Sequence, residues 1–327
     1  MAVYGKKQVN IREDNKSAVV DLLLKSQASM PEMSAKLGLS HTSLAKVVNE
    51  LMKKNVVVPV DYDTSAFGRP SKVYGINGDC AVSCAIVNMV DKIYIYYFDM
   101  RGFQINETVF DNDLDGIGPL TQRVISEVFR LKEHPRLKDK IIKYIYVGVP
   151  NDGLYGNDFN VCKQEFLTSF NNALASVCVQ VQHNADYEII AEKKYGSLKN
   201  GEKNAVLVSF EDSVSASLMI DKDVYYGDEY LHGKFICKIK EGEGYTDEKF
   251  ITVFKELSSL LSFLNIKTVV LSGKIKNRGD EALALAKSVF KEKVNVKFSL
   301  TGHDVPSALS GAVWVAVYST LQELMQR

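Results

Sequence analysis

The sequence lacks any apolar run of about 18 residues or more, the length that a membrane-spanning helix needs. Its first residues, Met1 to Ile11, are too polar for the apolar core of a secretion signal. From these two absences we expect a cytoplasmic protein with no membrane partner. The length of 327 residues exceeds that of one ordinary domain, so we expect two or three folded units.

Cysteine is scarce and odd in number, which argues against a disulfide framework. Most of the cysteines lie in apolar, strand-like runs, so we expect buried thiols. Cys80 and Cys84 have a spacing that could provide half of a zinc site, but no second pair of ligands lies near them in the sequence. We therefore expect no metal and no cofactor. The five cysteines are Cys80, Cys84, Cys162, Cys178 and Cys237.

Neither sign of charge is in excess over the chain, whose formal net charge is zero. The distribution along the chain is uneven, however. Residues 1–78 hold 11 lysines and arginines against 7 acidic residues, a charge of +4, whereas residues 79–327 hold 29 against 33, a charge of −4. A basic N-terminal part on an acidic remainder favours contact of that part with phosphate.

The N-terminal part contains three helical patterns separated by capping residues. Apolar residues recur at helical spacing over residues 15–26. Ser29, with Glu32 three positions later, predicts the start of a second helix, and Gly38 predicts its end. Ser40 then caps a third helix. The predicted buried stripe of this third helix consists of Leu44, Val47, Val48 and Leu51.

Two helices joined by a turn as short as residues 38–40 must cross steeply, as in a helix-turn-helix. The third helix would then read DNA, because its open face carries groups that can approach base edges and phosphates. An ordinary three-helix bundle with a solvated face is the alternative for these helices alone. The predicted reading residues are Ser40, His41, Thr42, Ser43, Lys46 and Asn49.

A hairpin follows the third helix. Residues 56–62 and 71–76 have β-type composition, and the segment between them is rich in turn formers. Such a hairpin is the wing of a winged helix, and Arg69 at its tip could enter a narrow minor groove. The predicted wing contacts are Gly68, Arg69, Pro70, Ser71 and Lys72.

Beyond the hairpin, strands alternate with helices in two successive units, each of which begins with a meander and continues as β-α-β. This order predicts an α/β fold of the duplicated, actin-like (ribonuclease H-like) kind that sugar kinases have. We expect a winged helix-turn-helix over residues 1–78 and a two-lobed body over 79–327. The first lobe would span about 79–183 plus the helix 306–325, and the second about 184–305.

These features resemble the ROK family (repressors, open reading frames and kinases), specifically its NagC/XylR-type repressor branch. The resemblance rests on residues 15–51, including Gly38-Leu39-Ser40, and on Gly68-Arg69-Pro70 after the hairpin, and it continues in weaker form to the C-terminus. In this family the reader helix enters the major groove and the wing arginine enters the minor groove. The resemblance implies the second role for Arg69.

The resemblance also locates the positions at which the family's kinases do chemistry. The catalytic base lies in an Asn-Asp-Ala-Asn segment, which corresponds here to residues 183–186, with Asn184 in the place of the base. An amide cannot accept the substrate proton, and Asp186 is displaced by two positions. The two phosphate loops correspond to residues 87–91 and 211–215, and neither contains a glycine. These differences predict a body without kinase activity.

The hexose-binding segment of the family corresponds to residues 233–237, of which only the first glycine is kept, and the zinc loop is absent. We therefore expect either no small effector or an acidic or phosphorylated carbohydrate derivative, with Lys234 available to pair with it. The candidate cleft residues are His183, Asn184, Asp186, Lys234 and Cys237.

The combined expectation is a DNA-binding transcriptional regulator, by resemblance a repressor of carbohydrate-utilisation genes. A homodimer or higher homo-oligomer on a near-palindromic operator in double-stranded DNA is expected, because symmetric proteins bind symmetric sites. An active carbohydrate kinase with an accessory DNA-binding head is the first alternative. A winged helix that binds a protein instead of DNA is the second.

Overall fold

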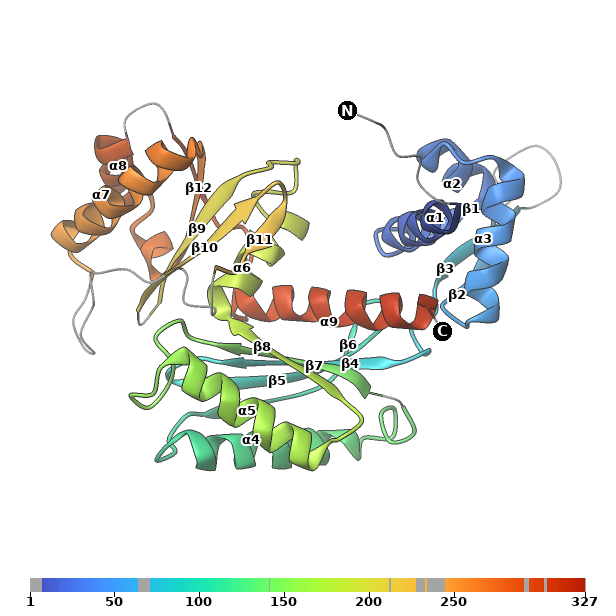
Figure 1. Ribbon diagram of the computed structural model, residues 1–327, viewed down its shortest axis with the longest axis horizontal. Coiled ribbons are helices and arrows are strands. Elements are labelled where there is room, and N and C mark those ends of the chain that lie inside the picture. The colour runs from blue at the N-terminus through green and yellow to red at the C-terminus, as the bar shows by residue number, and fades with distance from the viewer. Residues whose placement is uncertain are drawn as a thin grey trace.

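The computed structural model shows a winged-helix head beside a body of two sheets (Figure 1). Of the predicted site residues, Gly68, Arg69, Pro70, Lys234 and Cys237 lie outside the described part of the chain. The described residues are 8–63, 71–140, 142–211, 213–227, 233, 245–290, 294–302 and 305–326.

The head contains three helices and a small antiparallel sheet with the strand order β1-β3-β2. The predicted strand 71–76 coincides with β3, and the helix capped by Ser40 begins at His41 as expected. The elements are α1 (Gln8–Leu23), β1 (Ala28–Ser29), α2 (Met30–Leu37), α3 (His41–Lys53), β2 (Val57–Asp63) and β3 (Ser71–Ile76).

The first helix differs from its predicted bounds of 15–26. It begins seven residues earlier, at Gln8, and ends at Leu23. Arg12 and Lys16 of its first turns pair with Glu50 of α3, at 2.7 and 3.1 Å. These ion pairs hold a polar stretch in helical form that apolar periodicity cannot reveal.

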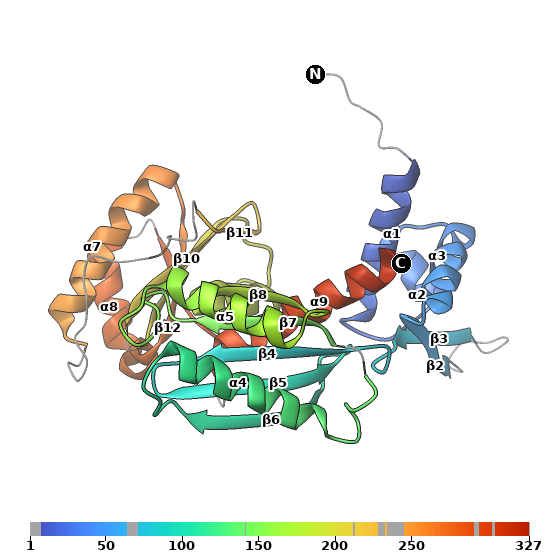
Figure 2. The same cartoon turned by 60° about the horizontal axis from the view of Figure 1, so that its bottom comes forward.

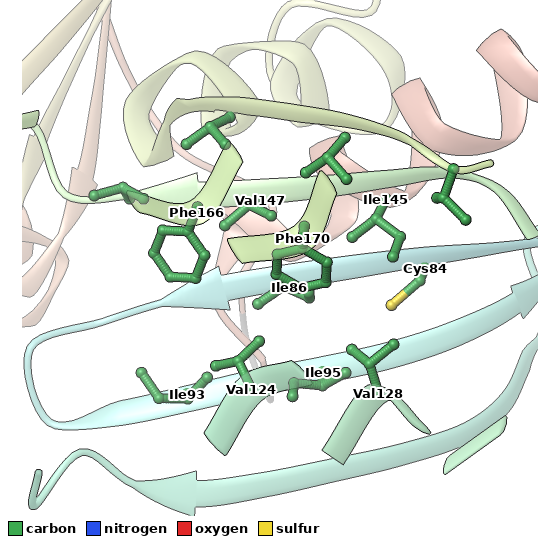
Figure 3. Close-up of a cluster of buried hydrophobic side chains, with 14 of the residues drawn as sticks. Cys84, Ile86, Ile93, Ile95, Val124, Val128, Ile145, Val147, Phe166 and Phe170 are labelled. Atoms are coloured by element: carbon green, nitrogen blue, oxygen red, sulfur yellow. The ribbon is translucent and has the colours of Figure 1, made fainter. Parts of the chain in front are cut away.

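The first body sheet has the strand order β6-β5-β4-β7-β8, with α4 and α5 on one face. Figure 3 shows Val124 and Val128 of α4 and Phe166 and Phe170 of α5 packed against apolar strand residues. Burial of this apolar surface stabilises the layer by about 25 cal/mol per Å². The elements are β4 (Val82–Asn88), β5 (Lys92–Asp99), β6 (Gln104–Asp111), α4 (Ile117–Lys132), β7 (Ile142–Val149), α5 (Phe159–Ala173) and β8 (Cys178–His183).

One cysteine contradicts the expectation of buried thiols. Cys178 is exposed, because it begins the edge strand β8, in which alternate residues face solvent. Cys84 and Cys162 are buried, and Cys80 is half-buried.

The second body sheet repeats the arrangement of the first. Its order, β11-β10-β9-β12-β13, again has an antiparallel meander followed by two parallel strands. This repetition confirms the duplicated actin-like fold expected from the sequence. The elements are β9 (Ala205–Phe210), β10 (Val214–Ile220), β11 (Asp223–Tyr225), α7 (Asp247–Leu264), β12 (Thr268–Gly273), η1 (Lys274–Arg278), α8 (Gly279–Phe290) and β13 (Asn295–Phe298).

Two helices, α6 (Asn184–Lys194) and α9 (Ser307–Gln326), pack tightly against each other at the centre of the body. A Cβ atom on Gly311 of α9 would lie only 1.8 Å from the carbonyl oxygen of Tyr187. A Cβ atom on Gly148 of β7 would lie 2.3 Å from Asn184 Oδ1. These two glycines therefore permit α6 to approach both α9 and the first body sheet closely.

The helix α9 continues from the body into the head, as both views show (Figures 1 and 2). Val317, Leu321 and Met325 of α9 belong to the same buried cluster as the core residues of the head helices. Lys16 Nζ of α1 also donates to the carbonyl oxygen of Met325, at 3.3 Å. The core of the head is thus completed by α9. In the described part of the chain, no helix is long and apolar enough to cross a membrane.

Candidate functional site

The exposed face of α3 carries the predicted reading residues. The apolar stripe Leu44, Val47, Val48 and Leu51 is buried against the rest of the head. Ser40 caps the helix by accepting a hydrogen bond from the Ser43 backbone N–H at 3.3 Å. The helix lies at the outer edge of the head, on the side away from the second body sheet (Figure 1). All six predicted reading residues are exposed: Ser40, His41, Thr42, Ser43, Lys46 and Asn49.

The start of α3 is fixed by its connection to α2. Gly38 has a φ of 65°, which is the left-handed conformation that ends a helix, and its N–H donates to Ser34 O. Ser34 Oγ donates to Leu39 O at 2.7 Å, which closes the turn. This short, hydrogen-bonded connection limits the angle at which α2 and α3 cross.

The wing strands lie next to α3 in the chain. Strand β3 is central to the small sheet: it pairs with β2 and with the two-residue strand β1. Ser71 and Lys72 begin β3, opposite Asp63 and Tyr62, and Lys72 is exposed. The predicted tip of the hairpin, residues 64–70, lies outside the described part of the chain.

Sequence reasoning missed the role of Glu50 at the back of the reading helix. Burial raises its pKa, but hydrogen bonds from Lys16 and Arg12 outweigh this effect and leave the pKa of Glu50 below its usual value. The carboxylate therefore stays charged and ties α3 to α1. The spacing of Glu50 from Lys54, one helical turn later, was the available signal for an ion pair at this end of α3.

The two segments that correspond to the kinase phosphate loops border a small cavity between the two body sheets. Its volume is about 30 Å³, which is roughly the share of one water molecule in liquid water. Ligand pockets usually have volumes of about 300 to 1,000 Å³. The described lining residues are Met89, Val90, Pro150, Asn151, Asn184, Glu188, Ser209, Glu211, Ser213 and Ser215.

Of the three described cleft candidates, only Asn184 lines this cavity. Its Nδ2 donates to the backbone oxygen of Asn88 at 2.8 Å. Asp186 is fully buried and accepts a hydrogen bond of 2.6 Å from Ser217 Oγ. His183 is also fully buried, and its ring lies 3.7 Å from that of Phe159. Asp186 and the Nδ2 of Asn184 therefore have partners within the protein, whereas Asn184 Oδ1 is buried and accepts no hydrogen bond within the described residues.

Glu188 is a further cavity residue that sequence reasoning missed. Burial, together with the nearby charge of Glu211, raises the pKa of Glu188 to about 7. Its Oε1 accepts a hydrogen bond from Ser209 Oγ at 3.0 Å. Two carboxyl groups thus line the space where a kinase would hold phosphate, and a charge on either of them would repel it. The signal was present in the sequence, because Glu188 follows Asn184 by one helical turn.

The sequence matches no protein-family model, and no curated protein is significantly similar to it. Solved structures do share its fold. The crystal structure of a ROK family transcriptional regulator, a homologue of the E. coli MLC protein, matches with a TM-score of 0.72 over 97% of this chain and 100% of that chain, at 13% identity.

Sugar kinases match the chain less completely. A putative sugar kinase from Cytophaga hutchinsonii has a TM-score of 0.55, with 12% identity over 72% of this chain and 99% of its own. The ROK hexokinase from Thermus thermophilus has a TM-score of 0.54, with 12% identity over 74% of this chain and 99% of its own. The resemblance expected from the sequence is confirmed at the level of architecture. The chain shares its overall fold with the ROK regulator and its two-lobed body with the sugar kinases.

Proposed function

We propose that the protein is a DNA-binding transcriptional regulator of the ROK repressor branch and that it represses carbohydrate-utilisation genes. The observation that carries the proposal is the face of α3, where six polar reading residues are exposed together while the opposite stripe is buried. A match over nearly the full chain to a ROK regulator supports the same proposal. We propose that the functional boundary between head and body lies near residue 78.

Replacing Lys46 tests this proposal directly. Lys46→Ala is expected to weaken binding to an operator selected from random DNA by about 1 to 3 kcal/mol, through loss of a phosphate or guanine contact. The measurement is a titration at fixed salt. Lys287→Ala is the matched control, because Lys287 is exposed on α8, at the opposite end of the molecule from α3 (Figure 1).

Arg69→Ala, in the same titration, is expected to relax the preference for A·T pairs beneath the wing. If Lys46→Ala and Arg69→Ala both bound like the parent protein, the reading face would be assigned wrongly. If the parent protein selected no DNA sequence at all, the head would instead serve the alternative function of protein binding. A near-palindromic selected site would support the proposed homodimer or higher homo-oligomer.

The body is proposed to have no kinase activity. The volume of the interlobe cavity, the amide of Asn184 and the carboxyl groups of Glu188 and Glu211 support this proposal over the alternative of an active carbohydrate kinase. Asn184→Asp is expected to stay inactive, because the loops would still lack amides positioned for phosphate. The measurement is ATP turnover with common hexoses. Turnover by the parent protein above a buffer control would refute the proposal.

The interlobe cleft is proposed to serve mainly as a scaffold for assembly. Its small volume and the internal hydrogen bonds of Asn184 Nδ2 and Asp186 support this choice over an effector site there. The alternative is a sugar acid or sugar phosphate bound through Lys234. Calorimetry with such anions would detect it, and the heat should then vanish in Lys234→Ala.

A further inference from the structure

A second and larger cavity lies where the head meets the body. Its volume is about 320 Å³, within the usual range for pockets that bind small molecules. It is bordered by the residues that follow α1, by the β5–β6 turn, by the end of α6 and by the middle of α9. We call it the junction pocket. Among its lining residues are Leu24, Lys25, Arg101, Lys194, Trp314 and Val317.

One wall of the junction pocket is apolar and partly aromatic. Trp314 stacks on Tyr318, one helical turn later, with ring centroids 5.9 Å apart. Leu24, from the head, and Val317 also line the pocket. A flat apolar group in the pocket would therefore contact an indole ring and aliphatic side chains, and it would lose water on binding.

The rim of the junction pocket carries three cationic side chains from three different elements. Lys25 is exposed, and Lys194 Nζ lies 3.9 Å above the ring of Trp314. Arg101 pairs with Asp99 at 2.7 Å and has an exposed side chain. One further carboxylate, Asp21 of α1, lies near Lys194 and Lys25.

The three cations thus exceed the two nearby carboxylates. Asp21 Oδ1 is buried and accepts no hydrogen bond within the described residues. Asp21 therefore compensates the lysines through charge alone. A ligand that brings an acid group would add the opposite charge that the rim lacks.

We propose that the junction pocket binds a small organic anion with a flat apolar body. The apolar body would lie against Trp314, and the acid group would lie between Lys25 and Arg101. Because Lys25 belongs to the head and Trp314 to the body, the ligand would contact both at once. A ligand that contacts both parts of the chain favours the arrangement in which both contacts are made. Its occupancy would therefore bias the position of the head.

A fluorescence titration tests binding without reference to DNA, because Trp314 is the single tryptophan of the chain. The probe is anilinonaphthalene sulfonate, and the matched neutral probe is phenylnaphthylamine, which lacks the sulfonate. We expect the sulfonate to quench Trp314 by energy transfer and to bind about tenfold more tightly than the neutral probe. Equal affinity of the two probes, or sulfonate binding without quenching, would overturn the proposal.

The contribution of the rim is tested with charge reversal. Lys25→Glu is expected to weaken sulfonate binding about tenfold or more, whereas Lys287→Glu should leave it unchanged. Both lysines are exposed, so neither change should unfold the protein. Unchanged binding in Lys25→Glu would contradict the assigned position of the acid group.

The expected effect of pocket occupancy on DNA binding by the head rests on the proposed function, and it is tested separately. Saturating sulfonate probe is expected to change the affinity for a selected operator by about fivefold or more, and Lys25→Glu should abolish this change. If the probe binds as described but no operator can be selected, the proposed function fails and the pocket stands. If the operator is bound and the probe leaves its affinity unchanged, the coupling to the head is refuted.

Discussion

Replacing Glu192 by glutamine is expected to lower the free energy of unfolding by about 3 kcal/mol or more at neutral pH. The Glu192 side chain is fully buried in α6, and its carboxylate accepts hydrogen bonds from three backbone N–H groups and two hydroxyl groups. An amide nitrogen in place of one oxygen would face N–H donors and leave them unsatisfied. The donors are Ser197 N, Ser299 Oγ, Leu300 N, Thr301 N and Thr301 Oγ1, at 2.7, 2.8, 3.2, 2.9 and 2.6 Å.

The effect of Glu192→Gln should depend on pH in a defined direction. Burial alone would raise the pKa of Glu192, but the hydrogen bonds from Thr301, Ser197 and Ser299 outweigh it and lower the pKa. The carboxylate therefore stabilises the fold at pH values above its unfolded pKa of about 4.5. This stabilisation is lost as the pH falls through the lower pKa that Glu192 has in the folded state. Denaturant unfolding at several pH values measures this. Equal stability of variant and parent at pH ~7 would contradict the prediction.

The same substitution one helical turn earlier provides a matched control with the opposite sign. The pKa of Glu188 is raised to about 7, so the folded state favours its protonated form. The contribution of Glu188 to the free energy of unfolding is fully favourable below its unfolded pKa of 4.5. It is lost as the pH rises through its folded pKa of about 7. Above that pH, Glu188→Gln is expected to stabilise the protein by up to about 3 kcal/mol. Two glutamates on one face of α6 should therefore respond to the same change in opposite directions.

Leu321→Ala is expected to destabilise the head by about 2 to 5 kcal/mol, since it opens a cavity in a shared core. Leu321 of α9 is fully buried in the cluster that contains Val19 of α1 and Val48 of α3. Loss of this contact should lower the hydrogen-exchange protection of α1 and α3 and, with it, the fraction of molecules able to bind an operator.

Leu309→Ala is the control for this prediction. Leu309 lies on the same helix and is almost fully buried, but it belongs to a cluster within the body. The Leu309→Ala substitution should lower the stability of the body without a selective loss of hydrogen-exchange protection in α3. If the two variants affected the head equally, α9 would not be a specific support for the head.

Features that depend on local chemistry could be predicted from the sequence. The helix α3 begins where expected and the strand β3 has the expected bounds, because a serine cap and turn-forming residues mark these positions. The exposure of the reading residues follows from the same stripe. The two body sheets were predictable as well, since each repeats one order of strands and helices.

Features that depend on contacts between distant residues could not be predicted. The two-residue strand β1 exists only because Ala28 and Ser29 pair with Tyr74 and Val73 of β3. The junction pocket combines Lys25, Arg101 and Trp314, whose proximity no local pattern indicates. The interlobe cavity could be located from family landmarks, but its small volume depends on how closely α6 approaches β7.

The shared core of head and α9 has a consequence for the order of events during synthesis. Lys16 and Met325 are 309 positions apart, yet their contact is part of the support of the head. A nascent chain that has exposed α1, α2, α3 and the wing still lacks the α9 residues that complete their core. Long-range contacts of this kind form late and slow folding. A head emerging from the ribosome should therefore remain incompletely packed until α9 follows, and under the proposed function an unfinished chain would be a poor competitor for the operator.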